Sequence, residues 1–517
     1  MKKSSAVIVM MFMIILSSIS IADVRGNELV RIGLNFSNKN VQSISVSSAE
    51  ILGIFASVDR TPIKIFECDS KSVSFEKGTP TSANAVYDKR FSTFSALDQE
   101  VGALRQQNST AFYYYDQGWY LVLGRYDSVS SAKSKLGSFK GIQSSQLTVL
   151  NTKADDVYVL ANGKSLMAYS SVSSDFFVAP VTYPESGIVT YNGKTYRGGI
   201  GANRSAINDM AAVNYLMMDH YMYGILPKEM SGSWPIEALK AQAVVARNFA
   251  ISSFDKHEDE GYDLCDTTDC QVYGGYSVEA LASNFAVDES SGDLLYYNDE
   301  LVTGYYHSNS GGKTASIDNV WTAPSPYLIS VEDPYSIGSP NTDWVVMMTP
   351  KEIANKLSGK NYFIGDLKSI KVSEVANDGR VQEILFIGTK GTATLKKEEM
   401  RKVFGYRTFK SIWFEVLTDD VMSVANNSLY SKVALSDAKV YNGSTKTPLI
   451  SNSAVSVLGV EGRVSVDMSP STYTFAGHGF GHGIGMSQWG AKNMADLGKS
   501  YEEILYHYYS GTQIINN

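Results

Sequence analysis

The 517-residue chain has no excess of basic side chains. It contains 45 Lys and Arg residues against 53 Asp and Glu residues, which gives a formal net charge of −8 and a pI near 5.4. Proteins that bind the phosphates of nucleic acids carry basic patches. We therefore exclude nucleic acid as an expected partner. The composition is typical of a soluble globular protein, and the length predicts two or more domains.

The apolar run near the N-terminus is too short for an ordinary membrane span. Residues 6–21 follow Lys2 and Lys3, and a transmembrane helix needs about 20 apolar residues. The small residues that end at Ala22 suit cleavage by a signal peptidase. We expect residues 1–22 to be a signal peptide that exports the protein to the cell exterior or the cell wall. An uncleaved run would anchor it to the membrane instead.

Cysteine is scarce, with three residues in the whole chain. Cys265 and Cys270 are separated by four residues and follow His257. Thiolates and imidazole at this spacing can hold zinc in a closed, tetrahedral, structural site. An exported protein could equally join Cys265 to Cys270 in a disulfide, which would leave Cys68 without a partner. The sequence leaves both alternatives open.

Two familiar hydrolase signatures are missing. His478 and His482 have the spacing of the two-histidine zinc signature, but the Glu between them is absent. Glycine stands at every odd position from 477 to 485, and each Gly costs about 1 kcal/mol relative to Ala in a helix, so this segment must be a loop. Ser308, next to His307, lacks the glycine-flanked turn of a serine nucleophile, which excludes a serine hydrolase.

Glu229 is the strongest candidate for acid chemistry. Apolar side chains surround it in the sequence, and the same neighbours in space would disfavour the ionised carboxylate and raise its pKa. A Glu with a raised pKa can act as a general acid near neutral pH. A glutamate in an ordinary surface loop would have no such role. The apolar neighbours are Leu226, Pro227, Met230 and Trp234.

A long helix with many small residues follows Glu229. Ser233 can cap it, and Pro235 can stand in its first turn, where the missing N–H costs nothing. Apolar residues then recur near helical spacing, and alanines narrow a second side, which predicts a buried central helix. These residues are Leu239, Ala243, Ala246, Ala250, Ala238 and Ala241.

The N-terminal part is expected to be rich in β-strands. Residues 30–65 alternate apolar and polar side chains in places, which is the pattern of half-buried strands. Residues 112–139 predict an aromatic strand, a turn and a helix, and Asn192-Gly193 predicts a hairpin. We place a domain boundary near Pro184. The predicted fold class is α+β, with a β-rich N-terminal region before a mixed α+β domain that contains the Ala-rich helix.

Four segments, in this order, resemble the SpoIID/LytB domain family, which comprises the stage II sporulation protein D and the amidase-enhancer proteins. They are residues 221–251, 265–275, 305–316 and 477–514. The resemblance extends from about Gly187 onward. With the predicted signal peptide and the boundary near Pro184, the chain divides into a signal peptide (1–22), a β-rich N-terminal region (23–184) and a SpoIID/LytB domain (185–517).

The resemblance implies a lytic transglycosylase that acts on peptidoglycan glycan strands stripped of their stem peptides. Glu229 would donate a proton to the glycosidic oxygen between N-acetylmuramic acid and N-acetylglucosamine. It would then take the proton of the muramic C6 hydroxyl as an anhydro ring forms. No metal or organic cofactor would enter this chemistry. Residues expected to contact the sugars are Arg247, His307, Ser308, Ser310, His478, His482 and Gln488.

The family also offers an alternative function, a non-catalytic wall-binding protein that activates a wall amidase, with Glu229 as a sugar contact. A third reading, a metal-dependent wall hydrolase that uses the histidines, predicts loss of activity with a chelator. Arg247 would orient Glu229 or contact the sugar. The glycine-rich loop would line the substrate site, or else be a packing turn whose histidines bond to the backbone.

Some family members are reported to bind zinc in the cysteine segment, which implies His257, Cys265 and Cys270 as ligands of a structural zinc. Where the family commonly has a His, this chain has Asp269. Residues 112–139 also resemble part of the SPOR module, which binds glycan strands without peptide stems. Aromatic rings there would stack on sugars, or else belong to the core.

Overall fold

The computed structural model describes residues 28–35, 41, 43–172, 174–205, 210–321, 323–419 and 470–516, and the backbones of short strands between 421 and 466. The expected signal peptide therefore lies outside the described residues. Within the described part of the chain, no helix has both the length and the apolar character that crossing a bilayer requires.

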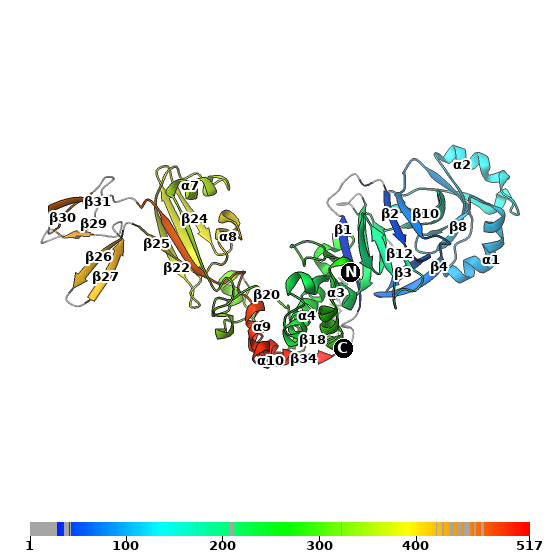
Figure 1. Cartoon of the computed structure of the whole chain (residues 1–517). Helices are drawn as coiled ribbons and strands as arrows, with labels where there is room; N and C mark the ends of the chain where they lie inside the picture. Colours follow the sequence, from blue (N-terminus) through cyan, green and yellow to red (C-terminus); the bar gives the residue numbers. More distant parts are fainter. Residues whose placement is uncertain are drawn as a thin grey trace, which may run out of the picture.

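The first of two large sheets has the strand order β17-β1-β16-β15-β12-β3-β4 and is antiparallel except where β1 meets β17. It lies beside the helices α3 (Met218–Glu229) and α4 (Ile236–Ile251) (Figure 1). Its strands are β1 (Leu29–Asn35), β3 (Leu52–Val58), β4 (Thr61–Glu67), β12 (Phe176–Pro180), β15 (Gly199–Asn203), β16 (Ala211–Met217) and β17 (Leu264–Cys265).

The second sheet has ten strands in the order β14-β13-β2-β5-β10-β11-β7-β8-β6-β9. In β2, Ser43, Ser45 and Ser47 are exposed while Ile44 and Val46 are buried, as the alternating pattern predicts. The β-rich N-terminal region is thus confirmed. The strands are β2 (Ser43–Ser48), β5 (Ser72–Lys77), β6 (Ala83–Tyr87), β7 (Phe112–Tyr115), β8 (Trp119–Tyr126), β9 (Leu147–Asn151), β10 (Asp156–Ala161), β11 (Lys164–Ser170), β13 (Ile188–Tyr191) and β14 (Lys194–Arg197).

Part of this sheet forms a β-α-β-β-α-β unit with α1 (Phe94–Gln107) and α2 (Val129–Lys135). Its four strands stand in the order β7-β8-β6-β9, the arrangement of ferredoxin-like folds. The rings of Tyr113, Tyr114 and Trp119 are buried, so they belong to the core. The resemblance to the SPOR module stays a prediction.

Each of the two large sheets contains strands from both sides of the expected domain boundary near Pro184. β13 and β14 follow it and join the sheet of β2, whereas β15 and β16 join the sheet of β1. One continuous hydrophobic core extends from Val30 to Tyr509. The strands of the N-terminal region and those that lead into the helices therefore pack as one unit.

The helices surround α4 (Ile236–Ile251), which is buried along most of its length and packs against α3 (Met218–Glu229), α5 (Leu281–Glu289), α9 (Gln488–Asp496) and α10 (Tyr501–Tyr508). The predicted central Ala-rich helix is confirmed. A small sheet of β18 (Asp293–Tyr297), β19 (Glu300–Leu301) and β34 (Gln513–Asn516) completes this part.

The start of α4 differs in detail from the prediction. Pro235 is the N-cap residue rather than a residue of the first turn, and its carbonyl accepts the first backbone bonds from Ala238 and Leu239. Ser233 does not cap the helix, since its hydroxyl bonds to Ser231. The helix therefore begins two residues later than a cap at Ser233 would imply, because Pro235 has a ψ of 139° and is not yet helical.

A second hydrophobic core lies between residues 344 and 475. Its elements are β21 (Asp343–Met348), α7 (Pro350–Ser358), β22 (Leu367–Val375), β23 (Val381–Gly388), β24 (Thr392–Lys396), α8 (Glu399–Phe404), β25 (Phe414–Thr418) and β32 (Tyr473–His478). Three hairpins follow β25: β26 (Val421–Asn426) with β27 (Leu429–Ala434), β28 (Lys439–Tyr441) with β29 (Lys446–Pro448), and β30 (Val455–Gly459) with β31 (Gly462–Val466).

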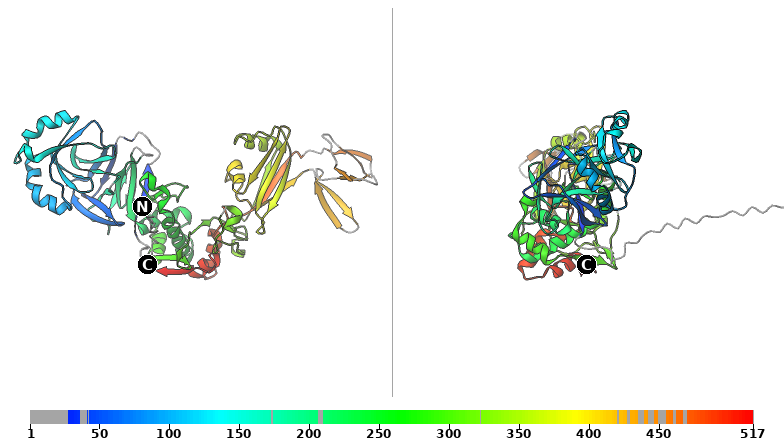
Figure 2. Two further views of the ribbon diagram at one scale, coloured as in Figure 1. Left: turned by 180° about the vertical axis from the view of Figure 1, so that it is seen from behind. Right: turned by 90° about the vertical axis from the view of Figure 1, so that its right-hand side faces the viewer.

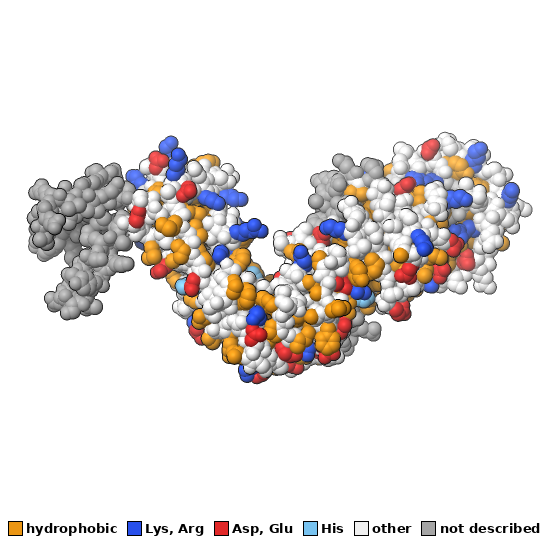
Figure 3. Space-filling model, viewed as in Figure 1, with side chains coloured by type: hydrophobic (Ala, Val, Ile, Leu, Met, Phe, Trp, Pro, Cys, Tyr) orange, Lys and Arg blue, Asp and Glu red, His pale blue; other side chains and the backbone are white. Residues whose placement is uncertain are grey.

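The helical part lies between the large sheets and this second core (Figures 1 and 2). The surface is hollowed between the two sheet-bearing parts (Figure 3). The chain enters the second core at β21 and returns through β32, which leads into the glycine-rich loop. The candidate site residues of that loop therefore stand where the second core joins the helices.

Candidate active site

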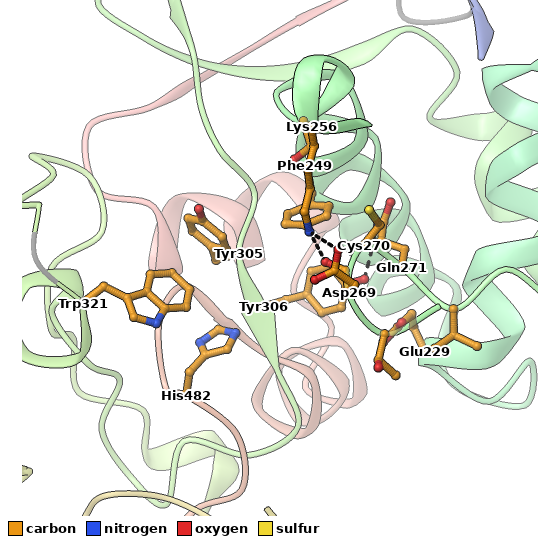
Figure 4. A pocket seen from close by; sticks show the side chains of 13 residues that line it. Glu229, Phe249, Lys256, Asp269, Cys270, Gln271, Tyr305, Tyr306, Trp321 and His482 are labelled. Atoms are coloured by element: carbon orange, nitrogen blue, oxygen red, sulfur yellow. Dashed lines mark hydrogen bonds and ion pairs between the residues drawn. The ribbon is translucent and has the colours of Figure 1, made fainter. Parts of the chain in front are cut away.

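A cavity of about 550 Å³ opens beside α4 and contains Glu229. Its walls come from segments far apart in the sequence: the end of α3, the end of α4 with the following 3-10 turns, the cysteine segment, the short strand β20 (Tyr306–His307) and the glycine-rich loop. Figure 4 shows Glu229, Tyr306 and His482 around the same space. All four segments that carry the family resemblance therefore contribute residues to this cavity.

Glu229 is the last residue of α3 and is half-buried. Its neighbours Leu226 and Met230 are 1% and 2% exposed, as expected from their place in the sequence. Gln488 Nε2 donates a hydrogen bond of 3.3 Å to Glu229 Oε2, and Tyr306 lines the cavity together with Glu229. Burial raises the pKa of Glu229, because its effect outweighs those of Gln488 and Tyr306, which favour the ionised form.

Aromatic rings form one wall of the cavity. The ring of Tyr305 lies 4.8 Å from that of Trp321 and 5.9 Å from that of Phe249, measured between centroids. Trp321 in turn lies 5.3 Å from His482. Aromatic faces with a few polar groups are typical of sites that bind small, partly apolar ligands such as sugars.

His482 is neutral at physiological pH. Its Nδ1 accepts a hydrogen bond of 3.0 Å from the backbone N–H of Ile484, so this nitrogen carries no proton. Burial lowers the pKa of His482 to about 3. His482 therefore contributes a fixed, uncharged ring to the cavity. The loop was expected either to line the site or to have histidines bonded to the backbone. His482 does both.

The glycine-rich loop packs against β20 and its neighbours with very little space. A Cβ atom on Gly485, which has a φ of +67°, would lie 2.0 Å from the carbonyl oxygen of Tyr305. A Cβ on Gly481 would lie 2.6 Å from Cβ of His307. Only glycine permits this approach, which explains why the loop is so rich in it.

His307 is 4% exposed and does not line the cavity. Its Nδ1 lies 3.1 Å from the carbonyl oxygen of Ile484, to which it donates, while Nε2 is buried with no hydrogen-bond partner among the described residues. Burial lowers the pKa of His307 well below its usual value. The ring lies 5.7 Å from that of His482, so His307 stands directly behind the cavity wall.

Arg247 is fully buried and contacts neither Glu229 nor the cavity. Its guanidinium donates to Asp219 Oδ1 at 2.9 Å and to the carbonyls of Ser290 and Asp293 at 2.8 and 3.2 Å. These bonds tie α3 and α4 to the segment after α5. The bonds of Arg247 thus hold parts of the fold together, and none of them reaches Glu229 or the cavity.

The remaining expected sugar contacts are spread over different environments. Ser310 is 2% exposed, and its hydroxyl donates to Asp333 at 2.6 Å. Ser308 is half-buried, and its carbonyl accepts from the backbone N–H of Trp489. His478 is exposed, lies 2.6 Å from Asp343 and does not line the cavity. Of the residues expected to contact sugars, His482 lines the cavity and Gln488 reaches Glu229.

The cysteine segment brings four potential metal ligands together beside this cavity. One ligand atom from each of His257, Cys265, Asp269 and Cys270 lies within 4.8 Å of all the others. The three cysteines of the chain are free thiols. Asp269 and Cys270 also line the cavity, so the cluster and the Glu229 site share a wall.

The donor set fits zinc. Thiolate sulfur, imidazole nitrogen and carboxylate oxygen are its usual ligands in four-coordinate sites. The Nδ1 atom of His257 lies 2.7 Å from Glu260, so an outer carboxylate orients the ring and leaves Nε2, 3.3 Å from Cys270 Sγ, for the metal. A hydrogen bond from Cys270 lowers the pKa of Cys265, which favours its thiolate.

Sequence reasoning did not single out several residues around Glu229. Tyr306 and Gln271 lie within segments that carry the resemblance, yet a lone Tyr or Gln there has no pattern that marks a site. Phe249 and Trp321 have no local signal, because an aromatic residue is most often core. Lys256 lines the cavity as well and lies 3.0 Å from Asp269.

Comparison with known proteins identifies a matching family. Residues 206–297 match the SpoIID family model, described as stage II sporulation protein. This segment contains Glu229, α4 and the cysteine cluster.

Three similar proteins have different names. The amidase enhancer of Bacillus subtilis is 28% identical over 426 residues, which cover 75% of this chain and 54% of that protein. The chain therefore spans about half the length of that relative. An uncharacterized protein of Brachyspira hyodysenteriae is 30% identical over 63% of this chain and 74% of its own length. Stage II sporulation protein D of Bacillus subtilis is 26% identical over 59% of this chain and 76% of its own length. Together with the matching family model, these similarities show that the chain belongs to the SpoIID family.

Proposed function

We propose that the protein is a lytic transglycosylase that cleaves the bond between N-acetylmuramic acid and N-acetylglucosamine in glycan strands without stem peptides. The supporting observation is a half-buried carboxyl group, Glu229, that has a raised pKa and faces a cavity with an aromatic wall. Such a carboxyl is protonated at higher pH than an ordinary Glu, and it can therefore act as a general acid.

The reaction proceeds in two proton transfers. First, Glu229 donates its proton to the glycosidic oxygen, the bond from that oxygen to the muramic C1 atom breaks, and positive charge develops at C1. Then the C6 hydroxyl of the same sugar attacks C1 and gives its proton to the Glu229 carboxylate. The product is a 1,6-anhydro ring, and Glu229 is protonated again. One carboxyl group suffices because the nucleophile belongs to the substrate.

The test is an assay of the purified protein on glycan strands freed of peptide by an amidase. Release of anhydro-muramyl products, identified by mass spectrometry, is the expected result. A hydrolase would instead release products heavier by one water molecule. If no product forms with or without metal, the transglycosylase assignment is wrong.

The alternative function is enhancement of a wall amidase, and the similarity to the amidase enhancer over 75% of this chain favours it. In that case the cavity would bind glycan without cleaving it. The two functions are distinguished by adding a purified wall amidase. An increased rate of peptide release, with no anhydro product from the protein alone, supports the enhancer.

The aromatic wall is expected to bind sugar rings. Trp321→Ala should weaken binding of peptide-free glycan by roughly three- to tenfold, because it removes one aromatic face from the cavity. Binding is measured by isothermal titration calorimetry. Phe363→Ala, which removes an aromatic ring that is 70% exposed outside the cavity, is the matched control and should leave the affinity unchanged. Equal losses for both variants would contradict the assignment of this wall.

We also propose that His257, Cys265, Asp269 and Cys270 hold a structural zinc. The metal would supply folding energy and play no part in the proton transfers. The purified protein should contain about one zinc equivalent, and a chelator should lower its Tm by at least about 5 °C. Cys68→Ser, which alters the cysteine outside the cluster, should bind the same amount of zinc, whereas Cys265→Ser should lose it. A zinc content below about 0.1 equivalent in the wild type contradicts the proposal.

Peptidoglycan lies outside the cytoplasmic membrane, and we propose that residues 1–22 direct export to it. Mass spectrometry of the exported protein would show an N-terminus after Ala22. Detection of the intact N-terminus in a membrane fraction would identify an anchor instead.

A further inference from the structure

We propose that Gln242 and Gln488 act as a coupled amide pair that holds the side chain of Glu229 in both of its protonation states. Gln488 donates to the carboxylate, and a joint half-turn of the two amides presents its oxygen to the protonated acid. This inference rests on the proposed function, because that reaction takes Glu229 through both states. Gln242 and Gln488 are positioning residues in it.

The two glutamines come from two helices that pack against each other. Gln242 belongs to α4 and is fully buried, and Gln488 is the first residue of α9 and is 8% exposed. Because water has little access to these amides, their hydrogen bonds depend on the neighbouring side chains.

The amide nitrogen of Gln488 contacts two oxygen atoms. It lies 3.3 Å from Glu229 Oε2 and 3.4 Å from Gln242 Oε1. An ionised carboxylate can only accept hydrogen bonds, so the nitrogen of the amide must face it. This nitrogen carries two protons, one for Glu229 and one for Gln242. The arrangement in the structure is therefore the one that suits the carboxylate.

The amide nitrogen of Gln242 is not satisfied in this arrangement. It is buried and has no hydrogen-bond partner among the described residues. A buried N–H group without a partner is rare in folded proteins, because it has lost its bonds to water. A half-turn of the Gln242 amide alone does not help, since its nitrogen would then face the nitrogen of Gln488, and two donors cannot bond.

A half-turn of both amides gives this nitrogen a partner. Gln242 Nε2 then donates to Gln488 Oε1, and the same oxygen faces Glu229. An amide oxygen can accept two hydrogen bonds, but the second one requires a proton on the carboxyl of Glu229. The rotated arrangement therefore forms with the protonated acid. Each protonation state of Glu229 thus has a matching arrangement of the two amides.

The other titratable groups that line the cavity are Lys256, Asp269, Cys270, Tyr305, Tyr306 and His482. Lys256 pairs with Asp269 at 3.0 Å, and burial keeps the pKa of His482 at about 3, so its ring is uncharged at neutral pH. Burial likewise raises the pKa of Glu229, so its protonated form is reached at higher pH than that of an exposed Glu.

Charged residues on the helices around α3 have partners of their own. Asp288 of α5 accepts a hydrogen bond of 2.5 Å from the hydroxyl of Tyr223. The ion pairs are Arg247 with Asp219 (2.9 Å), Lys240 with Glu237 (3.0 Å) and Lys492 with Asp496 (2.5 Å). A response of the two glutamine amides at the titration midpoint of Glu229 can therefore be attributed to Glu229.

The test follows the glutamine side-chain amides by NMR of the ¹⁵N-labelled protein. Gln242→Met and Gln488→Met identify the two resonances by their disappearance, and ¹³C labelling of the glutamate carboxyl groups gives the titration midpoint of Glu229. Both amides should change with this midpoint, although the bond to Glu229 comes from Gln488 alone. In Glu229→Gln both changes should be lost.

Gln488→Met distinguishes the coupled pair from an electric-field effect. A change caused by the charge of Glu229 alone would persist at Gln242, whereas a change transmitted by Gln488 should disappear. The variant should also raise the midpoint of Glu229 by about half to one pH unit, since a bond to a carboxylate is stronger than one to a neutral acid.

Gln382 is the matched control in the same spectra. It is a half-buried glutamine of β23 whose Nε2 donates to the carbonyl oxygen of Asn319 at 2.8 Å. Its amide should not change at the midpoint of Glu229. Thermal unfolding of each variant verifies that it is folded, and leucine replaces methionine in a variant that does not fold.

The outcomes separate this inference from the proposed function. A Gln242 amide that does not change at the midpoint of Glu229 overturns the coupled pair, even if anhydro products form. A change at Gln242 that persists in Gln488→Met overturns it as well. The expected coupled change in a protein that releases no anhydro product supports the pair and removes the transglycosylase.

Discussion

Glu229→Gln is expected to lower the release of anhydro-muramyl products by about 10²- to 10⁴-fold, the contribution usual for a positioned general acid. The amide keeps the size of the carboxyl but has no acidic proton to give to the glycosidic oxygen. Gln488 remains to contact the side chain. Binding of peptide-free glycan should therefore change by less than about threefold.

Rates are measured by chromatography of the products and affinities by calorimetry. Glu289→Gln is the matched control, because Glu289 is an exposed glutamate at the end of α5 that does not line the cavity. It should retain the wild-type rate. A Glu229→Gln variant that also retains the wild-type rate would show that another group supplies the proton.

The pH dependence of the wild type should follow the same acid. The pKa of Glu229 is raised, so its protonated form persists to higher pH than that of an exposed Glu. As the pH rises through this pKa, the acid is lost and kcat/KM falls. We expect an alkaline limb above the usual titration range of Glu, and a limb within that range would contradict the burial of this carboxyl.

Arg247→Met is expected to destabilise the protein by about 3 to 5 kcal/mol, the cost of removing one partner from a buried ion pair. It would leave the carboxylate of Asp219, which is 7% exposed, without its cation. The carbonyls of Ser290 and Asp293 would lose their donors as well. Urea unfolding, followed by the tryptophan fluorescence, measures the loss.

Two variants test the cause of that loss. Asp219→Asn combined with Arg247→Met should recover part of the stability, because it removes the unpaired charge. Arg407→Met, at an exposed position, should change stability by no more than about 0.5 kcal/mol. If Arg247→Met unfolds like the wild type and instead weakens glycan binding, Arg247 acts on the substrate from a different conformation.

Local patterns accounted for much of the fold. Period-two alternation predicted strands such as β2, and the apolar spacing after Pro235 predicted α4, although its N-cap is Pro235 and not Ser233. Glycine at five odd positions excluded a helix around His478 and His482. These features depend on neighbours in the chain, and the sequence displays those directly.

The same patterns could not orient the side chains of the site. Because α4 is buried on nearly all sides, its periodicity does not reveal which face Arg247 occupies. The serines after β20 show a polar turn, yet Ser310 points into the protein toward Asp333. His478 and His482 are four residues apart, but the tight turn of the loop places the first outside the cavity and the second within it.

The sequence by itself determined the α+β class, the family, the acidic candidate Glu229 and the cysteine cluster, because each depends on residue types at short spacing. Only the tertiary structure decided that Tyr306, Gln271 and the aromatic wall surround Glu229, and that Arg247 supports the fold. Those contacts join segments separated by tens to hundreds of residues, such as Gln488 and Glu229, which are 259 positions apart. Burial, which sets the protonation of Glu229, is a property of the assembled chain.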